Sequence, residues 1–317
     1  MTNPNCWQYS DRSNMCNLLK RLAPTEGFTL TPLDGVKLMR WNRSLPRSPV
    51  LYEPSIVVIC SGHKIGYLGH EIFHYNPQHF LVLSVPLPFE SETIATEEEP
   101  LMGISIRINI SILTELILML DQGSSHSDLG SHGMVSTPLD AKLSNAVLRL
   151  LQALASTDET DILGHNILRE IHYRVLTSSQ GEAIRALLSQ QNNLGKISKA
   201  LRRIHSDFAD DLNITKLAGE SGMSVAAFHA SFKAVTATSP MQYLKTTRLH
   251  KARLLMIQDG TSAALASTKV GYESPSQFSR EFKRLFGKTP MEDVVATREA
   301  LITLPFDPAS RYVTVQQ

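Results

Sequence analysis

The sequence predicts an α+β protein in which a β-rich N-terminal half is followed by a helical C-terminal half. Three observations support this prediction. Short β-branched runs separated by turn residues fill residues 28–108, the spacing of apolar residues becomes helical from about Leu113 onward, and five residues of the last third recur fifty positions later. A chain of 317 residues is long enough for two domains, each with its own core.

The two parts of the chain differ in charge, although the net charge of the whole is only +1. Residues 196–290 contain 15 Lys and Arg against 7 Asp and Glu, a net of +8, whereas residues 1–195 contain 14 against 19, a net of −5. A positive domain joined to a negative one favours a polyanion as the partner of the positive domain only.

The three cysteines, Cys6, Cys16 and Cys60, form neither a disulfide framework nor a metal-binding spacing, which is typical of free thiols in a reducing cytosol. The N-terminus lacks a basic segment followed by an apolar run, and no apolar stretch reaches the roughly 20 residues that span a bilayer. We therefore expect a cytoplasmic protein without a membrane partner.

The strands are predicted to begin after residue 26, because residues 1–26 are polar and unpatterned apart from one short helical stretch. The run 54–60 is β-branched, the run 80–85 ends at prolines, and residues 101–108 alternate with isoleucines on one side. Short strands separated by turn residues indicate a barrel or a sandwich.

Helical spacing follows the strands, with a loop of turn-forming residues between the first two helices. These helices are predicted at 113–120, 139–155, 161–176 and 182–190, and the loop at 121–137. On the second helix, apolar residues form a stripe to be buried on the same chain or on a second subunit. The stripe consists of Leu143, Val147, Leu150, Leu151 and Leu154.

A short polar segment at 190–195 is the predicted linker between two packed domains. The predicted division is a tail at 1–26, a first domain at 27–189, the linker at 190–195, a second domain at 196–297 and a C-terminal tail at 298–317. The second domain is predicted to be entirely helical, with helices at 197–208, 215–221, 225–235, 241–257, 262–269, 275–286 and 290–296.

The repeat lies within this helical domain. Phe228, Phe232, Lys233, Pro240 and Met241 recur as Phe278, Phe282, Lys283, Pro290 and Met291. In each copy a short helix, a glycine and an amphipathic helix follow one another, which is the order of a helix-turn-helix motif. Two such motifs in tandem can place two helices in successive major grooves of one DNA duplex.

Each amphipathic helix has two opposite stripes. The phenylalanines at positions i and i+4 are expected to pack inward, so the other stripe must face solvent or a ligand. We expect the outward residues to read base edges: Ala226, His229 and Ala230 in the first copy, and Ser276, Gln277, Ser279 and Arg280 in the second. Phosphate contacts are expected from Lys233, Lys283 and Arg284 and from the helix N-caps Ser224 and Ser274.

The second copy is expected to carry more of the sequence preference. Arg280 can donate two hydrogen bonds to guanine O6 and N7, whereas Ala226 and Ala230 can contact little more than a thymine methyl group.

Residues 214–290 resemble the DNA-binding domain of the AraC/XylS transcription regulators. The likeness lies in Leu217-Ala218, Gly222-Met223-Ser224, Arg248-Leu249, Ala252-Arg253 and the stretch 270–290. Many relatives carry a larger polar residue where this chain has Ala230. The resemblance implies a sequence-specific regulator that binds a promoter operator in double-stranded DNA, with RNA polymerase as a further partner.

The N-terminal part resembles the corresponding domain of one AraC-type subgroup, through Tyr52-Glu53-Pro54-Ser55, Tyr75-Asn76-Pro77 and residues 170–176. This likeness implies a cupin-like β-barrel followed by helices used for dimerisation, with the stripe at 143–154 as the candidate interface. It leaves two roles open for the barrel, which are binding a small effector or only mediating contacts. A homodimer is favoured because one pair of reading helices covers only a short site.

Two residues are candidates for an effector site. Cys60 ends an apolar strand and is expected to point into the barrel, as a sensing thiol or as a packed cysteine. Lys64 follows a Ser-Gly turn, where it either meets an anionic effector or stays exposed.

Two other interpretations compete with a sequence-specific regulator. One is a cupin-type metal-dependent enzyme with an appended helical bundle, and the other is an architectural DNA binder with little sequence preference. A metal-dependent cupin uses two histidines one residue apart, and no His-x-His occurs. Because phosphate loops, nucleophile elbows and zinc spacings are also absent from the sequence, we expect no enzymatic activity and no cofactor.

Overall fold

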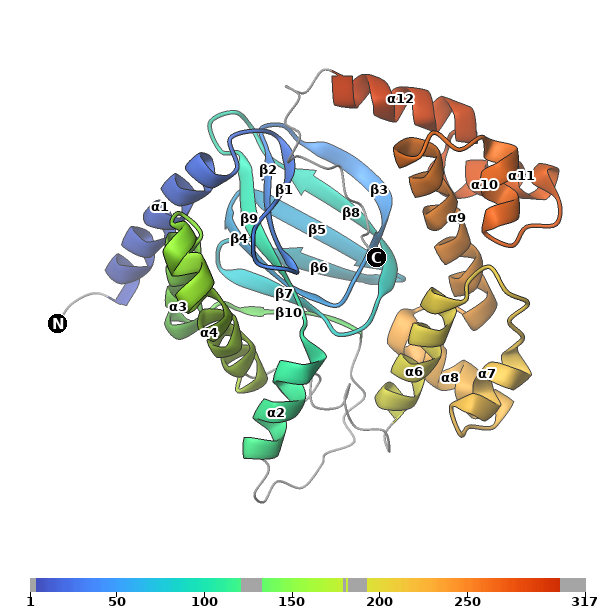
Figure 1. The fold of residues 1–317 in the computed structure, drawn as a ribbon, viewed down its shortest axis with the longest axis horizontal. Helices are drawn as coiled ribbons and strands as arrows, with labels where there is room; N and C mark the ends of the chain where they lie inside the picture. Colours follow the sequence, from blue (N-terminus) through green and yellow to red (C-terminus); the bar gives the residue numbers. More distant parts are fainter. Residues whose placement is uncertain (1–3, 121–132, 179–180, 182–192, 303–317) are drawn as a thin grey trace.

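The chain is α+β, with a β-rich N-terminal domain and a helical C-terminal domain, as predicted (Figure 1). The structure is a computed structural model that describes residues 4–120, 133–178, 181 and 193–302. The strands lie in the middle, with helices α1, α3 and α4 on one side and the C-terminal helices on the other (Figure 1).

Ten strands form two antiparallel sheets within the described residues. The six-stranded sheet has the order β1 (Gly27–Leu30), β2 (Val36–Trp41), β9 (Leu101–Arg107), β4 (Ser55–Ser61), β7 (His79–Leu83) and β10 (Met134–Pro138). The four-stranded sheet has the order β3 (Leu45–Tyr52), β8 (Leu87–Ile94), β5 (His63–Leu68) and β6 (Glu71–Tyr75).

The predicted cupin-like barrel is not closed. Each sheet forms its own ladder, and no ladder among the described strands joins the two sheets. They meet where Ser136 of β10 donates a hydrogen bond to the carbonyl of His74 in β6. The sandwich alternative therefore describes the arrangement better than a closed barrel does.

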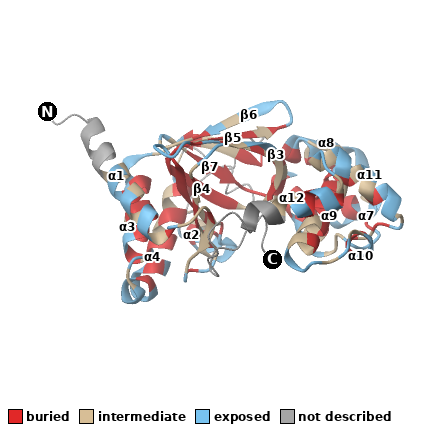
Figure 2. Ribbon diagram, turned by 90° about the horizontal axis from the view of Figure 1, so that it is seen from above, coloured by how far each residue is buried: buried red, intermediate tan, exposed pale blue. Residues whose placement is uncertain are grey.

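Strand β4 explains why the sequence gives a continuous apolar run instead of an alternating one. Every residue of β4 is buried, because both faces of the six-stranded sheet are covered (Figure 2). Ile56, Val58 and Cys60 pack toward the helices α1 and α3, whereas Val57 and Ile59 pack toward the second sheet and the C-terminal domain.

The segment before the strands is helical, not an unpatterned tail. Helix α1 spans Pro4–Leu22 and buries Met15 and Leu19, which are four residues apart, against the six-stranded sheet. Its Arg12 Nε donates a hydrogen bond of 3.0 Å to the carbonyl of Cys60. The short helical stretch expected in this segment, around Met15–Leu22, is the end of this helix, and the sequence pattern does not reveal the earlier part because most of its residues are polar.

The middle of the chain contains one strand that the sequence does not reveal. Helix α2 spans Ile110–Leu120, α3 spans Ala141–Ala153 and α4 spans Thr157–Leu176, close to their predicted positions. Residues 134–137, predicted as the end of a loop, instead belong to β10 (Met134–Pro138), which pairs with β7 from Met134 opposite Leu83 to Pro138 opposite His79. The rest of that loop and the helix predicted at 182–190 lie outside the described residues.

The C-terminal domain consists of α6 (Asn193–Ser206), α7 (Ile214–Glu220), α8 (Val225–Thr236), α9 (Pro240–Gln258), α10 (Ala263–Lys269), α11 (Pro275–Phe286) and α12 (Pro290–Ile302). Helix α6 begins inside the predicted linker, and α12 extends past residue 297 into the predicted tail. No helix among the described residues combines the length and the apolar composition needed to cross a membrane.

The two domains share one apolar core. Phe228 and Phe232 of α8 and Ile197 and Leu201 of α6 belong to the same buried cluster as the inner faces of the two sheets. Tyr243 of α9 is fully buried at this boundary. Its hydroxyl accepts a hydrogen bond of 2.7 Å from His205 Nε2 and donates one of 2.7 Å to the carbonyl of Pro86. The orientation of the first helix pair is therefore fixed by the sheets.

We predict that Tyr243→Phe lowers the free energy of unfolding by about 1–3 kcal/mol, because it leaves a buried imidazole N–H and a carbonyl without their partner. Urea unfolding measures this change. Tyr67→Phe removes the hydroxyl that donates to Glu92 near the surface and serves as the control. An equal loss in both variants would contradict the special role of Tyr243.

Two histidines with strongly lowered pKa values predict a loss of stability in acid. Burial lowers the pKa of His205 to about 4 and that of His250 to about 3, with Lys251 and Arg253 respectively adding to the effect. Between the usual value of 6.5 and these values the unfolded chain binds protons that the folded chain does not bind. Stability is therefore highest above pH 6.5 and falls as the pH decreases, by about 1–2 kcal/mol per histidine down to pH 5.

Urea unfolding of the wild type and of His250→Leu at pH 7 and pH 5 tests this, with a smaller pH effect expected for the variant. His70→Leu, at an exposed position, is the control. A pH effect that is unchanged in His250→Leu would show that this histidine does not contribute.

Candidate nucleic-acid interface

Helix α8 has the two faces that its sequence predicts. Phe228 and Phe232 are fully buried, and their rings lie 5.5 Å apart between centroids. The opposite side carries the predicted outward residues. Of these, Ala226, Ala230 and Lys233 are exposed and His229 is half-buried. The helix begins at Ser224, whose hydroxyl accepts a hydrogen bond from the amide of Ala227.

Helix α11 repeats this arrangement. Phe278 and Phe282 are fully buried, with ring centroids 5.6 Å apart. The opposite side carries the predicted reading and phosphate-binding residues. Of these, Ser276, Gln277, Arg280, Lys283 and Arg284 are exposed and Ser279 is half-buried. Ser274 caps the helix by accepting a hydrogen bond from the amide of Gln277.

The outward side chains of α11 differ in whether they already make hydrogen bonds within the protein. The side-chain amide of Gln277 donates to Glu281 at 3.2 Å, and the hydroxyl of Ser279 donates to the carbonyl of Pro275 at 2.9 Å. Arg280 makes no hydrogen bond or ion pair with any residue that the structure describes. Its guanidinium keeps all its donors for a ligand, whereas Gln277 must first give up a partner.

Glu281 fastens α11 to its neighbours. It accepts hydrogen bonds from Lys245 Nζ at 3.0 Å and from the hydroxyl of Tyr272 at 2.7 Å, besides the one from Gln277. Partial burial acts to raise the pKa of Glu281, but these hydrogen bonds outweigh it and the pKa is lowered. The carboxylate therefore stays ionised and holds α11 against α9.

Arg248 of α9 links the two helix pairs, a role that the sequence pattern does not reveal. Its guanidinium donates to the carbonyls of Phe208, Asp210 and Gly271 at 2.7, 2.8 and 3.0 Å. The segment between α6 and α7 is thereby joined to the turn between α10 and α11.

Gly271 is required at that turn. It has a φ of +84°, and a Cβ there would lie 2.4 Å from the carbonyl oxygen of Ala209. The glycine of the second pair thus serves a close backbone approach as well as a turn.

The predicted effector residues lie on opposite sides of the six-stranded sheet. Cys60 is buried and packs toward α1, with its Sγ 3.9 Å from Met15 Sδ, so it does not point into the sandwich as expected. Burial raises the pKa of its thiol. Strand alternation places Cys60 on the helix-covered face, since its neighbour Ile59 faces the interior.

Lys64 is buried, not exposed. Only 5% of the residue is accessible, its Nζ donates to the hydroxyl of Thr93 at 3.2 Å, and it lies 5.2 Å from the centre of the Trp41 ring. Lys64 and Cys60 therefore cannot line one site.

The stripe predicted for dimerisation packs within its own chain. Leu143, Val147, Leu150 and Leu151 are buried against α1 and the six-stranded sheet, and Leu154 is partly buried there. The four buried side chains are thus unavailable to a partner. The exposed apolar residues of this region lie instead on α2 and α4, and they include Leu118, Met119, Ile162 and Leu163.

The histidines of the first domain do not assemble a metal site in the described part of the chain. No group of three or more His, Cys, Asp or Glu side chains there could hold a metal ion. His63 Nε2 lies 3.0 Å from His74 Nδ1, and burial together with His74 lowers the pKa of His63.

Comparison with protein families matches both parts of the chain. Residues 32–183 match the model of the AraC-type transcriptional regulator N-terminus, and residues 217–293 match a helix-turn-helix domain. The combination defines a regulator with an AraC-type first domain and a helix-turn-helix second domain. The chain belongs to the AraC/XylS family of transcriptional regulators, as its sequence motifs indicate.

Two curated relatives illustrate the similarity. The thermoregulatory protein LcrF of Yersinia pestis is 24% identical over 175 residues, which cover 54% of this chain and 64% of LcrF. The transcriptional activator RhaS of Escherichia coli is 28% identical over 102 residues, 32% of this chain and 37% of RhaS. The chain thus matches less than two thirds of the length of either relative.

A solved structure has the same fold. The crystal structure of ToxT from Vibrio cholerae with a bound unsaturated fatty acid aligns with a TM-score of 0.58 and 13% identity, covering 85% of this chain and 96% of ToxT. The apo structure of a ToxT variant gives a TM-score of 0.57 and 11% identity, covering 84% of this chain and 99% of that one. The likeness extends over both domains.

Proposed function

We propose that this protein is a transcriptional regulator that binds specific DNA sequences by placing α8 and α11 in adjacent major grooves as two helix-turn-helix motifs. The observation that supports this most strongly is the matched exposure of the two repeated helices. Both bury their phenylalanines completely and leave the opposite stripe open to a ligand. Helix α9 connects them with 19 residues, about 28 Å of helix, which is close to the roughly 34 Å between successive grooves.

Charge supports a nucleic acid as the ligand of this surface. Exposed cations surround the two helices, namely Lys216, Lys233, Lys269, Lys283 and Arg284. In our proposal they neutralise phosphates together with the N-termini of α8 and α11 at Ser224 and Ser274. These contacts set the position of the protein on DNA without reading its sequence.

Base reading is assigned chiefly to α11. Arg280 is free to make a bidentate contact with guanine, whereas Gln277 and Ser279 must exchange an internal hydrogen bond for a base. In α8 only His229 offers a polar reader, because Ala226 and Ala230 supply methyl groups. The first helix pair then mainly positions the protein on DNA, and the second pair mainly determines which base sequence is preferred.

Three further features belong to the proposal. RhaS is named a transcriptional activator, and we extend activation and contact with RNA polymerase to this chain. ToxT was solved with a fatty acid, and we extend control by a small effector bound to the first domain, although not the identity of that effector. We also propose a homodimer, because two copies double the length of DNA that is read.

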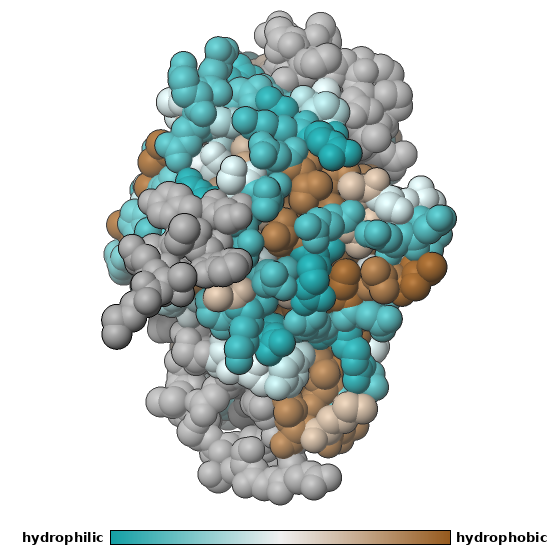
Figure 3. All heavy atoms as spheres, turned by 90° about the vertical axis from the view of Figure 1, so that its left-hand side faces the viewer, coloured by the Kyte–Doolittle hydropathy of each residue, from teal (hydrophilic) through white to brown (hydrophobic). Residues whose placement is uncertain are grey.

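The dimer surface that we propose lies on α2 and α4. Leu118 is 76% exposed and Ile162 is 70% exposed, and Met119 and Leu163 extend the same apolar surface. Arg169 of α4 donates to Glu115 and to Met119 Sδ of α2, which holds the two helices together. Apolar patches are visible among polar residues on this side of the molecule (Figure 3). Exposed apolar side chains in one region are typical of protein–protein contacts.

We predict that Arg280→Ala weakens binding to the preferred site by about 1–3 kcal/mol and relaxes base choice at one position. Selection from a random DNA pool identifies the preferred site of the wild type, and the affinity of both proteins is then measured at one stated salt concentration. An unchanged preference in the variant would contradict the reading role of Arg280.

Lys283→Ala is the matched control, since it removes a neighbouring cation from the same helix. It should weaken binding to all DNA sequences alike. It should also reduce the slope of the logarithm of the binding constant against the logarithm of the salt concentration by about one. If the wild type prefers no sequence over any other, the protein is an architectural binder and the proposed function fails.

We predict that Leu118→Asp weakens self-association about tenfold or more, because a carboxylate on an apolar interface must be desolvated. Sedimentation equilibrium measures the dissociation constant. Ile72→Asp changes an exposed apolar residue of β6 and is the control. A dimer that is equally sensitive to both changes, or to neither, would place the interface elsewhere.

A further inference from the structure

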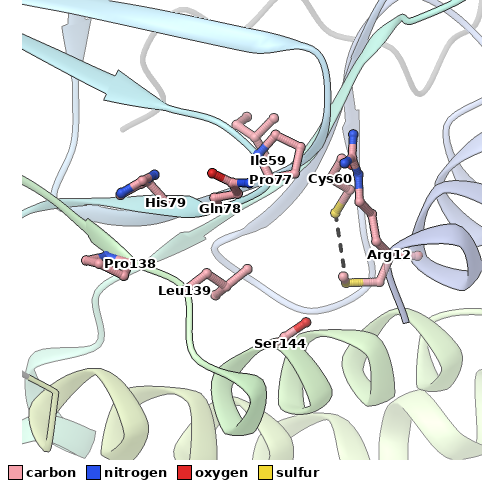
Figure 4. A pocket seen from close by; sticks show the side chains of 10 residues that line it. Arg12, Ile59, Cys60, Pro77, Gln78, His79, Pro138, Leu139 and Ser144 are labelled. Atoms are coloured by element: carbon pink, nitrogen blue, oxygen red, sulfur yellow. Dashed lines mark hydrogen bonds between the residues drawn. The ribbon is translucent and has the colours of Figure 1, made fainter. Parts of the chain in front are cut away.

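A pocket of about 420 Å³ lies on the side of the six-stranded sheet that faces away from the C-terminal domain. Its walls come from α1, the end of β4, the start of β7 and the connection between β10 and α3 (Figure 4). Pro77, Pro138 and Leu139 supply apolar wall, and Cys60 closes one side. The volume is within the range of roughly 300–1,000 Å³ that is usual for small-molecule sites.

A cation stands at one end of this pocket. Arg12 donates its Nε to the carbonyl of Cys60, which fixes the base of the guanidinium. Its Nη2 lies 3.6 Å from Glu99, which is 66% exposed in its side chain, so this ion pair is long and solvated. An anion inside the pocket can replace Glu99 at little cost.

A buried hydroxyl faces the same space from the other wall. Ser144 of α3 is only 8% exposed, and its hydroxyl points toward the cavity (Figure 4). Its hydroxyl donates no hydrogen bond to a residue that the structure describes, and it lines the pocket, where a ligand can reach it. A cation and an open hydroxyl around apolar walls are suited to a ligand with an apolar body and an acidic group.

We propose that this pocket binds a small amphipathic anion, with its acidic group at Arg12 and its apolar body between Leu139 and the prolines. In this proposal Cys60 lines the effector site, whereas Lys64 does not. The proposal deepens the proposed function, because it names the place and the chemistry of the effector.

Strand β10 connects the pocket to the DNA-binding domain. One end of the strand leads through Pro138 and Leu139 into the pocket wall. At the other end, the amide of Gly133 donates to the carbonyl of Val235 in α8 at 3.2 Å. A Cβ at position 133 would lie 2.9 Å from that carbonyl oxygen and 2.6 Å from a methyl of Val85, so strand and helix are in close contact. A ligand that moves the β10–α3 connection therefore acts on the first helix pair along five residues of strand.

The probe for this site is 1-anilinonaphthalene-8-sulfonate, which combines an aromatic body with a sulfonate and fluoresces when it is shielded from water. We expect one molecule to bind per folded full-length chain. Arg12→Gln should weaken binding about tenfold and Arg12→Lys much less, because the charge-assisted contact is lost only in the first variant. Gln78→Trp, on the rim of the pocket, should block binding without disturbing the core.

Two controls distinguish binding at this site from nonspecific binding of the probe. N-phenyl-1-naphthylamine has the same aromatic body without the sulfonate, so Arg12→Gln should leave its affinity unchanged. Arg21→Gln removes an exposed arginine from the same helix outside the pocket and should not affect either probe. If Arg12→Gln does not change binding of the sulfonate, or if Arg21→Gln changes it equally, the proposed site is wrong.

The coupling is tested on DNA. A saturating amount of the sulfonate should shift the affinity of the wild type for its preferred site, and should not do so in Gln78→Trp. A bound probe without any shift would overturn the coupling through β10. Failure of the wild type to bind DNA would overturn the proposed function alone, because the probe measurements need no DNA.

Discussion

The structure depends on the apolar core that the two domains build together. The inner faces of both sheets are not closed by strands alone, and α6 and α8 complete them with Ile197, Leu201, Phe228 and Phe232. Separating the domains would expose these side chains to water, each at a cost of roughly 1.5–3 kcal/mol. The hydrogen bonds that Tyr243 makes with His205 and Pro86 fix the orientation of the two domains at this contact. The first helix pair is therefore part of the core of the first domain and not an independent module.

The two helix pairs consequently pack against different cores. The first pair shares its core with the sheets, whereas the second has a separate core around Phe278, Phe282 and Met256. Helix α9 runs through both, and Arg248 binds carbonyls on either side of it. A change in the first domain thus reaches α8 through the shared core, and reaches α11 through α9 and through the contact of α11 with β3. This division agrees with a first pair that responds to regulation and a second pair that carries most of the base-reading chemistry.

Sequence reasoning identifies the outward faces of the repeated helices correctly but misplaces several residues of the first domain. The outward positions of α8 and α11 follow from helical periodicity and from the repeat, which are local properties. Lys64, Cys60 and the stripe at 143–154 depend on which face of a strand or helix meets another layer, and local pattern does not contain that information. An apolar stripe must be covered, but the sequence does not say whether its own sheet or a second subunit covers it. Strand β10 escapes prediction for the same reason, because a short segment that follows a run of turn-forming residues becomes a strand only when an edge such as β7 is available to pair with it.

The sequence by itself determined the α+β class, the family, most of the helices and the two opposite faces of the repeated helices, because periodicity and motif spacing act within a few turns of chain. The tertiary structure alone decided that the sandwich is open, that α1 packs on it, that Arg248 joins the helix pairs and that Arg12 and Ser144 face one pocket. These features bring together residues tens to more than a hundred positions apart in the chain. Such contacts form only when complementary surfaces bury one another, and that is a property of the folded chain as a whole.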